Sequence, residues 1–284
     1  MHPAAHISSA SLAEQICEDI EKKRIKLPTL PEVALQVREA IESDNAGADT
    51  VARVIAKDPA ISARLLQVAN SPLYPGSHNI DSLVHAVARL GVRLVRTLVT
   101  TLVMKQVFQT TSPVLQRQFR AIWDDGLQVA AISRVLADNV RHLENDQAML
   151  GGLIHNIGAL PILTRVNDCY GPDIDGTVVA QLIEEIGPKV GDQILRHWHF
   201  VAALANIPTA CQDLAYDPGP TATYADIVLV ARLQHLCCKG TRNHLTDWSR
   251  VPAFAKIGIE TEEIVLSTEE PSGQISQVRQ LLEG

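Results

Sequence analysis

The sequence predicts an all-α fold, and three observations lead to this prediction. No segment of the 284 residues shows sustained alternation of apolar and polar residues, which is the pattern of a half-buried strand. Hydrophobic residues make up 46% of the chain and aromatic residues only 4%, so leucine, valine, isoleucine and alanine must build a core that suits packed helices. Apolar residues also recur at helical spacing between proline-containing and polar breaks.

Prolines and polar runs divide the first 110 residues into short helices. A lead-in helix is expected over 8–23, where Ser11 and Glu14 have the spacing of a capping box. The segment 27–31 contains two prolines and ends it, and the second proline suits the first turn of a new helix. Further helices are expected from 31 to about 43, around 51–55, from 59 to about 69, and over 94–108.

Two short motifs flank the helix that is expected to begin at Pro59. Asp58 is its expected N-cap, because a carboxylate can accept hydrogen bonds from the first backbone N–H groups, and proline is favoured at the first helical position. At the other end, Asn70 is interpreted as a residue that accepts the awkward dihedrals found at a helix end, and Ser71 and Pro72 stop the helix. These residues are therefore interpreted as structural.

Prolines and polar residues also divide the second half of the chain into helices and loops. After the break at Ser112 and Pro113, residues 114–123 and 124–141 are expected as two helices, or as one kinked helix, with Trp123 at the join. The other expected segments are an apolar stretch over 145–166 that is helical at its start, a loop over 170–176, a long helix over 225–238, a polar loop over 242–252, and short helices over 260–267 and 271–283.

The octet over 151–158, GGLIHNIG, places a polar pair inside an apolar run. Apolar residues flank it on both sides, so His155 and Asn156 are expected to be largely buried. The paired glycines at its start allow another helix to approach closely, although each costs about 1 kcal/mol in helix propensity. The simplest interpretation of His155 is a buried histidine whose ring bonds Asp125, Asn156 or a backbone carbonyl.

These motifs, in this order, resemble those of a known family. The octet resembles the Gly-Leu-Leu-His-Asp-Ile-Gly motif of the HD superfamily of metal-dependent phosphohydrolases, in which the His and Asp bind a metal ion. The LPTLP segment over 27–31, the segments 58–66 and 69–71, and the later matches over 83–91 and 190–198 resemble the HDOD family, the HD-related output domains of bacterial signalling proteins.

The resemblance covers roughly residues 27 to 235 and implies an HD-like multi-helix bundle with an N-terminal helical lobe. The expected domain organisation is a lead helix over 1–26, an HDOD domain over 27–238 with a helical lobe (27–110) and an HD-like lobe (111–238), and a C-terminal helical extension over 239–284 that packs on the domain.

The sequence departs from the family pattern at the positions of its metal ligands. Asn156 replaces the metal-binding Asp, and a neutral amide binds hard cations less well than a carboxylate. Asp125 aligns with an earlier metal-binding His, and Arg232 falls near the position of a terminal Asp, where its charge would repel a cation. His155 and Asp125 remain weak candidate metal ligands. The resemblance therefore implies a degenerate site, and we expect no catalytic residue, bound metal or cofactor.

The expected function is a non-catalytic HDOD signalling module with a regulatory or scaffolding role in bacterial signal transduction, whose partners are signalling proteins. Three alternatives remain open: a metal-dependent HD-type phosphohydrolase, a nucleotide or small-ligand sensor that uses the vestigial site, and a purely protein-binding adaptor. A sensor of anions would need cationic groups at the cavity, for which Arg232 is a candidate, whereas an adaptor would need an exposed apolar patch.

Charge and cysteine content limit the partners and the compartment. The formal net charge of −7 provides no basic surface for phosphate backbones, so nucleic acid is not an expected partner. The five cysteines form no C-x-x-C pair, which suits free thiols in a reducing compartment. No signal-peptide pattern or long uninterrupted apolar span is visible, so a cytoplasmic protein without a membrane partner is expected.

Overall fold

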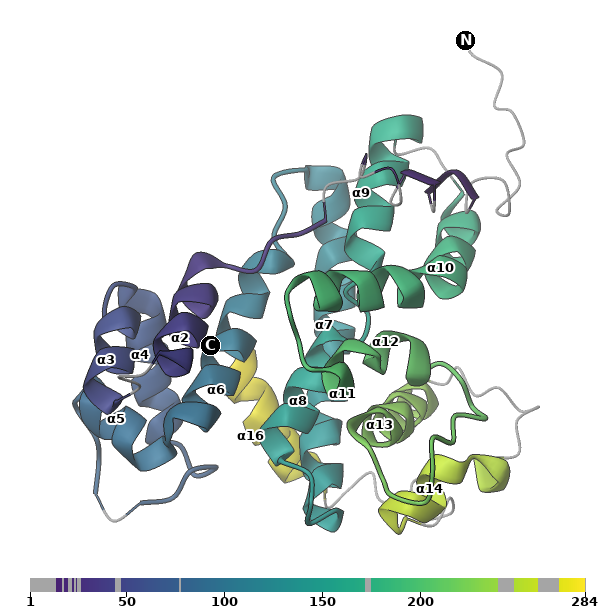
Figure 1. Cartoon of the computed structure of the whole chain (residues 1–284). Helices are drawn as coiled ribbons and strands as arrows, with labels where there is room; N and C mark the ends of the chain where they lie inside the picture. The colour runs from purple at the N-terminus through teal and green to yellow at the C-terminus, as the bar shows by residue number, and fades with distance from the viewer. Residues whose placement is uncertain are drawn as a thin grey trace.

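The computed structural model describes residues 27–43, 47–76, 78–171, 175–239, 248–259 and 271–283, together with residues 14–16, 18, 19, 22 and 24. Every regular element within these residues is a helix, which confirms the all-α prediction. The helices form two lobes that meet at a central group of helices, and one apolar core extends through both lobes (Figure 1). As the composition predicted, valine, leucine, isoleucine and alanine supply most of this core.

The N-terminal lobe is built around α6 (Val92–Val107), the predicted strongly apolar helix. In α6 the hydroxyl groups of Thr97, Thr100 and Thr101 donate to the backbone carbonyls four residues earlier, at 3.4, 2.8 and 2.9 Å. These bonds allow three polar side chains to lie on a buried face. The other helices of this lobe are α2 (Glu32–Glu42), α3 (Ala48–Ile55), α4 (Pro59–Ala69) and α5 (Leu83–Leu90).

The two motifs that flank α4 both make hydrogen bonds at the ends of the helix. Asp58 caps the helix as predicted, because its carboxylate accepts hydrogen bonds from the N–H groups of Ala60 and Ile61, both at 3.0 Å. Asn70 is the C-cap of the helix, and its φ of −99° and ψ of 3° depart from helical values. The Asn70 amide donates to the carbonyl of Ile80 at 2.7 Å and accepts from its N–H at 2.8 Å, which ties the following loop to the helix end.

Replacing Asp58 with alanine is expected to lower the free energy of unfolding by about 1 kcal/mol, because two N–H groups at the start of α4 lose their partner. Urea denaturation followed by circular dichroism measures the change. Ser82 offers a matched control, since it is the N-cap of α5 but makes no side-chain capping bond. Ser82→Ala should leave the denaturation midpoint unchanged, and an equally unchanged midpoint for Asp58→Ala would show that the cap contributes nothing.

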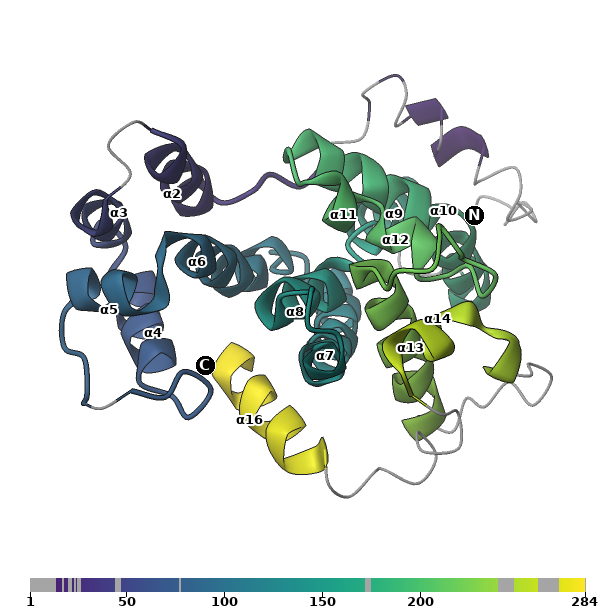
Figure 2. The same ribbon diagram turned by 60° about the horizontal axis from the view of Figure 1, so that its bottom comes forward.

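A long helix, α7 (Pro113–Leu136), lies at the centre of the molecule. It is a single helix of 24 residues followed by a 3₁₀ turn, η1 (Ala137–Asn139), so the alternative with two separate helices is wrong. Its neighbours are α8 (Asn145–Ile154), α13 (Tyr224–Cys238) and α16 (Pro271–Glu283). Figure 2 shows α16 extending from beside α7 toward the N-terminal lobe.

The apolar stretch over 145–166 that carries the octet forms two helices, α8 and α9 (Ala159–Tyr170), which are separated by turn residues 155–158. The polar pair of the octet therefore lies at a helix junction. By length and composition the segment Asn145–Tyr170 could cross a membrane, but 83% of its most apolar window is buried inside the protein. This segment is accordingly a core element of the helical bundle.

The rest of the C-terminal lobe is arranged around α10 (Gly176–His197), a helix of 22 residues. The smaller elements are α11 (Ala202–Ala205), α12 (Ile207–Ala210), η2 (Trp248–Arg250) and α14 (Pro252–Ile257). Residues 14–16 and 18–19 of the predicted lead helix are helical. Ser11 of its capping box and the predicted helix over 260–267 lie outside the described residues.

Hydrogen bonds join the two lobes on one side of α7. The indole N–H of Trp198 donates to the carbonyl of Pro28 at 2.9 Å, and the guanidinium of Arg38 donates to the carbonyl of Trp198 at 2.7 Å. The amide of Gln147 on α8 donates to the hydroxyl of Thr97 on α6 at 2.8 Å. These bonds hold the start of the N-terminal lobe against the end of α10, and α6 against α8.

Candidate functional site

The residues at the metal-ligand positions of HD proteins come from three adjacent elements. Asp125 lies on α7, His155 and Asn156 lie in the turn between α8 and α9, and Arg232 lies on α13. We call these four residues the HD-position cluster. The turn follows directly from α8, and both α8 and α13 pack against α7, so the fold itself assembles these positions.

The paired glycines of the octet allow this close packing, as predicted. A Cβ atom on Gly152 would lie 2.7 Å from the Cα of Ala130 on α7, and one on Gly151 would lie 2.6 Å from the Cδ1 of Ile207. The contact of Gly152 is with backbone, so a side chain there would force α8 away from α7, whereas the side chain of Ile207 on α12, near Gly151, can move aside. Gly152 therefore brings the backbone of α8 against α7 and holds the turn near Asp125.

Asp125 is bonded to two side chains that the sequence did not single out, His235 of α13 and Lys239, which follows that helix. Its Oδ1 atom accepts from the ammonium of Lys239 and lies 3.2 Å from Nε2 of His235. Burial opposes ionisation of Asp125, but the hydrogen bonds from His235 and Lys239 outweigh it and lower the pKa of the carboxyl group. Asp125 is therefore a carboxylate whose charge is already compensated within the chain.

His155 is buried, with 7% of its surface exposed, and its Nδ1 atom lies 2.7 Å from the backbone carbonyl of Gly152. This matches one of the three predicted partners. The pKa of His155 is lowered to about 4, chiefly because the ring is buried. The hydrogen bond to Gly152 raises this pKa in part, and the positive charge of Arg232 lowers it further. The ring is therefore neutral at physiological pH, with Nδ1 as the donor to the carbonyl.

Substituting His155 with glutamine is expected to flatten the dependence of stability on pH. Since an unfolded histidine titrates near pH 6.5, the unfolded chain binds more protons than the folded chain between about pH 4 and 6.5. Above pH 6.5 the full contribution of neutral His155 to the free energy of unfolding is present. This contribution, on the order of 3 kcal/mol, is lost as the pH falls from 6.5 toward 4.

Urea denaturation at a series of pH values measures this slope. Glutamine at 155 removes the titrating group, so the loss of stability on acidification should be smaller than in the native chain. His197→Gln serves as the control, because His197 is exposed and should leave the slope as it is. Identical slopes in His155→Gln and the native chain would show that burial does not perturb the titration of His155.

Asn156 makes a contact that an aspartate could not make. Its Nδ2 atom donates to the backbone carbonyl of Ile122 on α7 at 2.9 Å. An ionised carboxylate has only acceptors, so aspartate here would face the carbonyl with a second negative oxygen. The amide thus fastens the turn to α7, and its Oδ1 atom is buried without a hydrogen-bond partner among the described residues.

Arg232 does not bond to Asp125. Its Nη1 atom donates to the carbonyl of Cys211 at 3.4 Å, which connects α13 to the end of α12. Arg232 and His235 of α13 and Lys239, the residue that follows the helix, stand at positions i, i+3 and i+7 and therefore share a face. This spacing shows that the three side chains point the same way, but it does not identify Asp125 as the carboxylate that His235 and Lys239 meet.

A hollow of about 340 Å³ lies over Asp125, lined also by Asp124, His235, Lys239 and, from α16, Arg279. No three histidine, cysteine, aspartate or glutamate side chains in the described part of the chain are placed to hold a metal ion. A divalent cation at Asp125 would meet the charge of Lys239 and would find an amide at Asn156. The donor set therefore does not fit the metal of HD phosphohydrolases.

Comparisons with known proteins agree with this architecture. A family model of the HDOD domain matches residues 27–213. A solved structure from Shewanella amazonensis SB2B, provisionally described as a metal-dependent phosphohydrolase, is 24% identical with a TM-score of 0.82, and the match covers 96% of this chain and 99% of that chain. An HDOD domain protein of unknown function from Geobacter sulfurreducens is 19% identical with a TM-score of 0.64, over 96% of each chain.

Two further relatives are more distant or longer. A protein from Marinobacter aquaeolei VT8, provisionally described as a signal transduction protein, is 19% identical with a TM-score of 0.62, over 97% of this chain and 66% of that chain. An uncharacterized protein of Treponema pallidum (strain Nichols) is 23% identical over 224 residues, or 74% of this chain, and the chain spans 40% of its length. At these identities the solved structures establish the fold alone.

Proposed function

Because this chain belongs to the HDOD family, we propose that it is a non-catalytic signalling module with a regulatory or scaffolding role in bacterial signal transduction. The observation that carries the proposal is the bonding of Asp125 to His235 and Lys239. These side chains occupy the carboxylate that would otherwise bind a metal ion. The relative from Marinobacter, provisionally described as a signal transduction protein, supports the same class of role.

Chemical reasoning supports the non-catalytic part of this proposal. Metal-dependent hydrolysis of a phosphoester requires a cation that lowers the pKa of a bound water and holds the phosphate oxygens. In this chain Lys239 bonds the one carboxylate of the HD-position cluster, and Asn156 donates its amide to the backbone. The cluster has thereby become a set of internal contacts that join α7, the turn and α13. A scaffold of this kind acts through its surface, and we propose other signalling proteins as its partners.

Hydrolysis assays test the proposal against the phosphohydrolase alternative. A phosphodiester and a phosphomonoester are offered to the purified chain in the presence of manganese, magnesium or iron(II). We expect no rate above that of the metal alone, and the same result for His155→Ala. A metal-dependent rate that is abolished in His155→Ala would contradict the proposal and establish the phosphohydrolase.

A further inference from the structure

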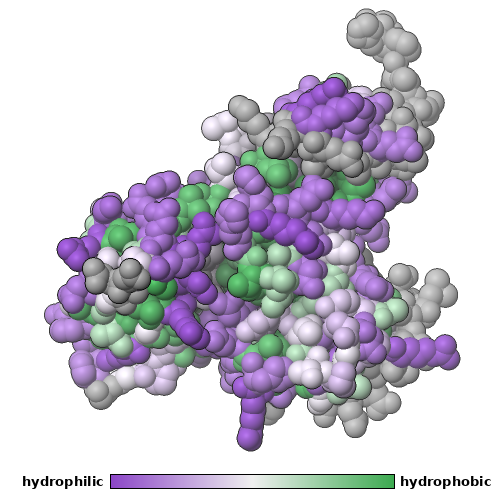
Figure 3. Space-filling view, in the orientation of Figure 1, coloured by the Kyte–Doolittle hydropathy of each residue, from purple (hydrophilic) through white to green (hydrophobic). Residues whose placement is uncertain are grey.

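A second cavity, of about 320 Å³, lies between the two lobes and is separate from the HD-position cluster. Helices α2 and α6 form its N-terminal side, while α8, α11 and the segment after α10 form the opposite side. Figure 3 shows the face of the molecule that is seen in Figure 1, and an apolar surface bordered by hydrophilic side chains lies at its middle, between the lobes. No residue of the HD-position cluster lines the cavity.

The cavity carries a net positive lining in an acidic protein. Arg38, Arg93 and Arg96 contribute three positive charges, against two carboxylates from Glu42 and Glu144, whereas the whole chain has a net charge of −7. Such a concentration of positive charge in a concave site raises the local concentration of anions. The lining therefore favours an anionic ligand.

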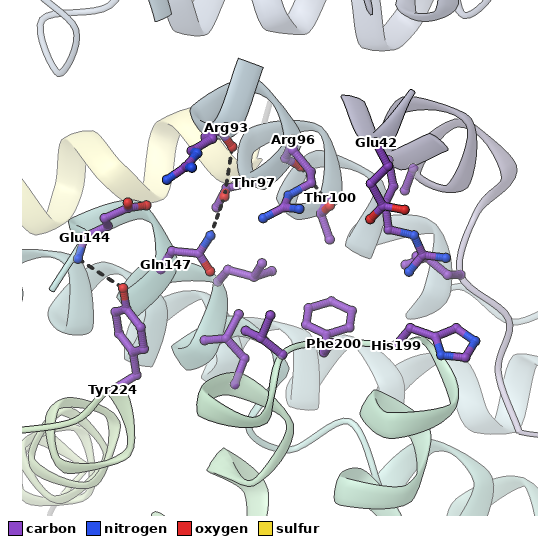
Figure 4. A pocket seen from close by; sticks show the side chains of 16 residues that line it. Glu42, Arg93, Arg96, Thr97, Thr100, Glu144, Gln147, His199, Phe200 and Tyr224 are labelled. Carbon is purple, nitrogen blue, oxygen red and sulfur yellow. Dashed lines mark hydrogen bonds between the residues drawn. The ribbon is translucent and has the colours of Figure 1, made fainter. Parts of the chain in front are cut away.

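Arg93 and Arg96 are the groups most available to such a ligand. They stand three residues apart on α6, and Figure 4 shows both side chains beside the cavity space. Their guanidinium groups make no hydrogen bond or ion pair with any residue that the structure describes. Arg38, by contrast, is already bonded to the carbonyl of Trp198. A guanidinium without an internal partner can bind a phosphate through two parallel hydrogen bonds.

The side of the cavity opposite the arginines offers an apolar wall and one hydroxyl group, that of Tyr224. Phe200, Leu150 and Leu204 line it, and the ring of Phe200 faces the space across from Arg96 (Figure 4). The hydroxyl of Tyr224 accepts from the N–H of Glu144 at 3.1 Å and keeps its own proton for donation. An aromatic ring beside apolar side chains suits the face of a planar group.

We propose that this cavity binds a small organic monophosphate with a planar ring, of which a nucleoside monophosphate is the representative. The phosphate would lie at Arg93 and Arg96, and the ring would lie against Phe200. Ligand cavities usually measure about 300 to 1,000 Å³, so this one suits a ligand of mononucleotide size. This proposal does not depend on the absence of hydrolytic activity.

Binding here would couple the two lobes. The phosphate contacts lie on α6 of the N-terminal lobe, whereas Phe200 belongs to the C-terminal lobe. A ligand that contacts both lobes favours the arrangement in which they are closed on each other, and it stabilises the folded chain more as its concentration rises above its Kd. The cavity would thus give a signalling module an input site.

Isothermal titration calorimetry of the full chain tests the proposal, with AMP, GMP, adenosine and inorganic phosphate as probes. We expect saturable binding of AMP or GMP at one site per chain, and weaker or undetectable binding of adenosine and of phosphate alone. Arg96→Gln and Arg93→Gln should each weaken nucleotide binding about tenfold or more, because a charge-assisted hydrogen-bond donor is lost. Phe200→Ala should weaken binding of the nucleotide and leave the response to phosphate unchanged.

Arg117→Gln is the matched control, since Arg117 is an exposed arginine of α7 outside the cavity. It should bind like the native chain, and circular dichroism should show that all variants are folded. Three results would overturn the proposal: no saturable binding of either nucleotide at millimolar concentration, equal losses in Arg117→Gln and Arg96→Gln, or phosphate binding as tight as that of the nucleotide.

Discussion

Gly158→Ala is expected to lower the free energy of unfolding by about 3 kcal/mol. Gly158 is the last residue of the octet, and it lies where the start of α9 crosses α10. A Cβ atom at this position would lie 2.0 Å from the carbonyl oxygen of Gly187 and 2.6 Å from the backbone nitrogen of Gly191. Both contacts are with backbone atoms, so no side chain can rotate away, and the two helices must separate.

The backbone of Gly158 does not itself require glycine, because its φ of −65° and ψ of −16° are helical values that alanine adopts readily. The expected loss is therefore entirely steric. Gly176→Ala is the matched control, since a Cβ at the first residue of α10 would meet nothing within 4 Å. Urea denaturation should give a stability for Gly176→Ala equal to or slightly above that of the native chain. A similarly small change for Gly158→Ala would show that α9 and α10 are not packed this closely.

The second large effect is expected at Asp226, whose side chain is completely buried at the start of α13. Its Oδ2 atom accepts from the N–H of Thr223 at 2.8 Å, while the Thr223 hydroxyl accepts from the N–H of Asp226 at 3.3 Å, which completes a capping box. Its Oδ1 atom lies 3.3 Å from the ammonium of Lys256 on α14. Asp226→Ala removes the capping carboxylate and leaves Lys256 without its buried partner. The free energy of unfolding should therefore fall by about 3 kcal/mol.

A double-mutant cycle separates these contributions. Lys256→Met alone leaves the capping box intact, so the coupling between the two substitutions reports the ion pair. Asp217→Ala is the control, because Asp217 also pairs with Lys256, at 2.7 Å, but its side chain is 52% exposed. Its replacement should lower the free energy of unfolding much less than replacement of Asp226, because solvent screens an exposed ion pair. An Asp226→Ala variant no less stable than Asp217→Ala would contradict the assigned role of the buried carboxylate.

Helix boundaries could be predicted from the sequence wherever local chemistry marks them. Asp58 and Pro59 start α4, and Ser112 and Pro113 start α7, because a capping side chain followed by proline favours the first helical turn irrespective of the surroundings. The turn over 155–158 could not be predicted in this way. It contains no proline, and its neighbours are apolar on both sides, so packing of Gly158 on α10 rather than local preference places the break.

The candidate site was only partly predictable for a related reason. The burial of His155 could be predicted from the apolar run around it. The partners of Asp125 could not be predicted, because His235 and Lys239 are more than a hundred residues away in the sequence and reach it only through the packing of α13 on α7. Likewise, the spacing of Arg93 and Arg96 shows that they share a face of α6, but the cavity exists only because the other lobe closes it.

The metal content of the purified chain tests the central claim most directly. If Lys239 and His235 have taken the place of a cation at Asp125, elemental analysis after gentle purification should find manganese, iron, zinc and magnesium well below one ion per chain. Addition of manganese should then show no tight site, and Asp125→Ala should give the same result as the native chain. One tightly bound metal ion per chain that is lost in both Asp125→Ala and His155→Ala would contradict the account.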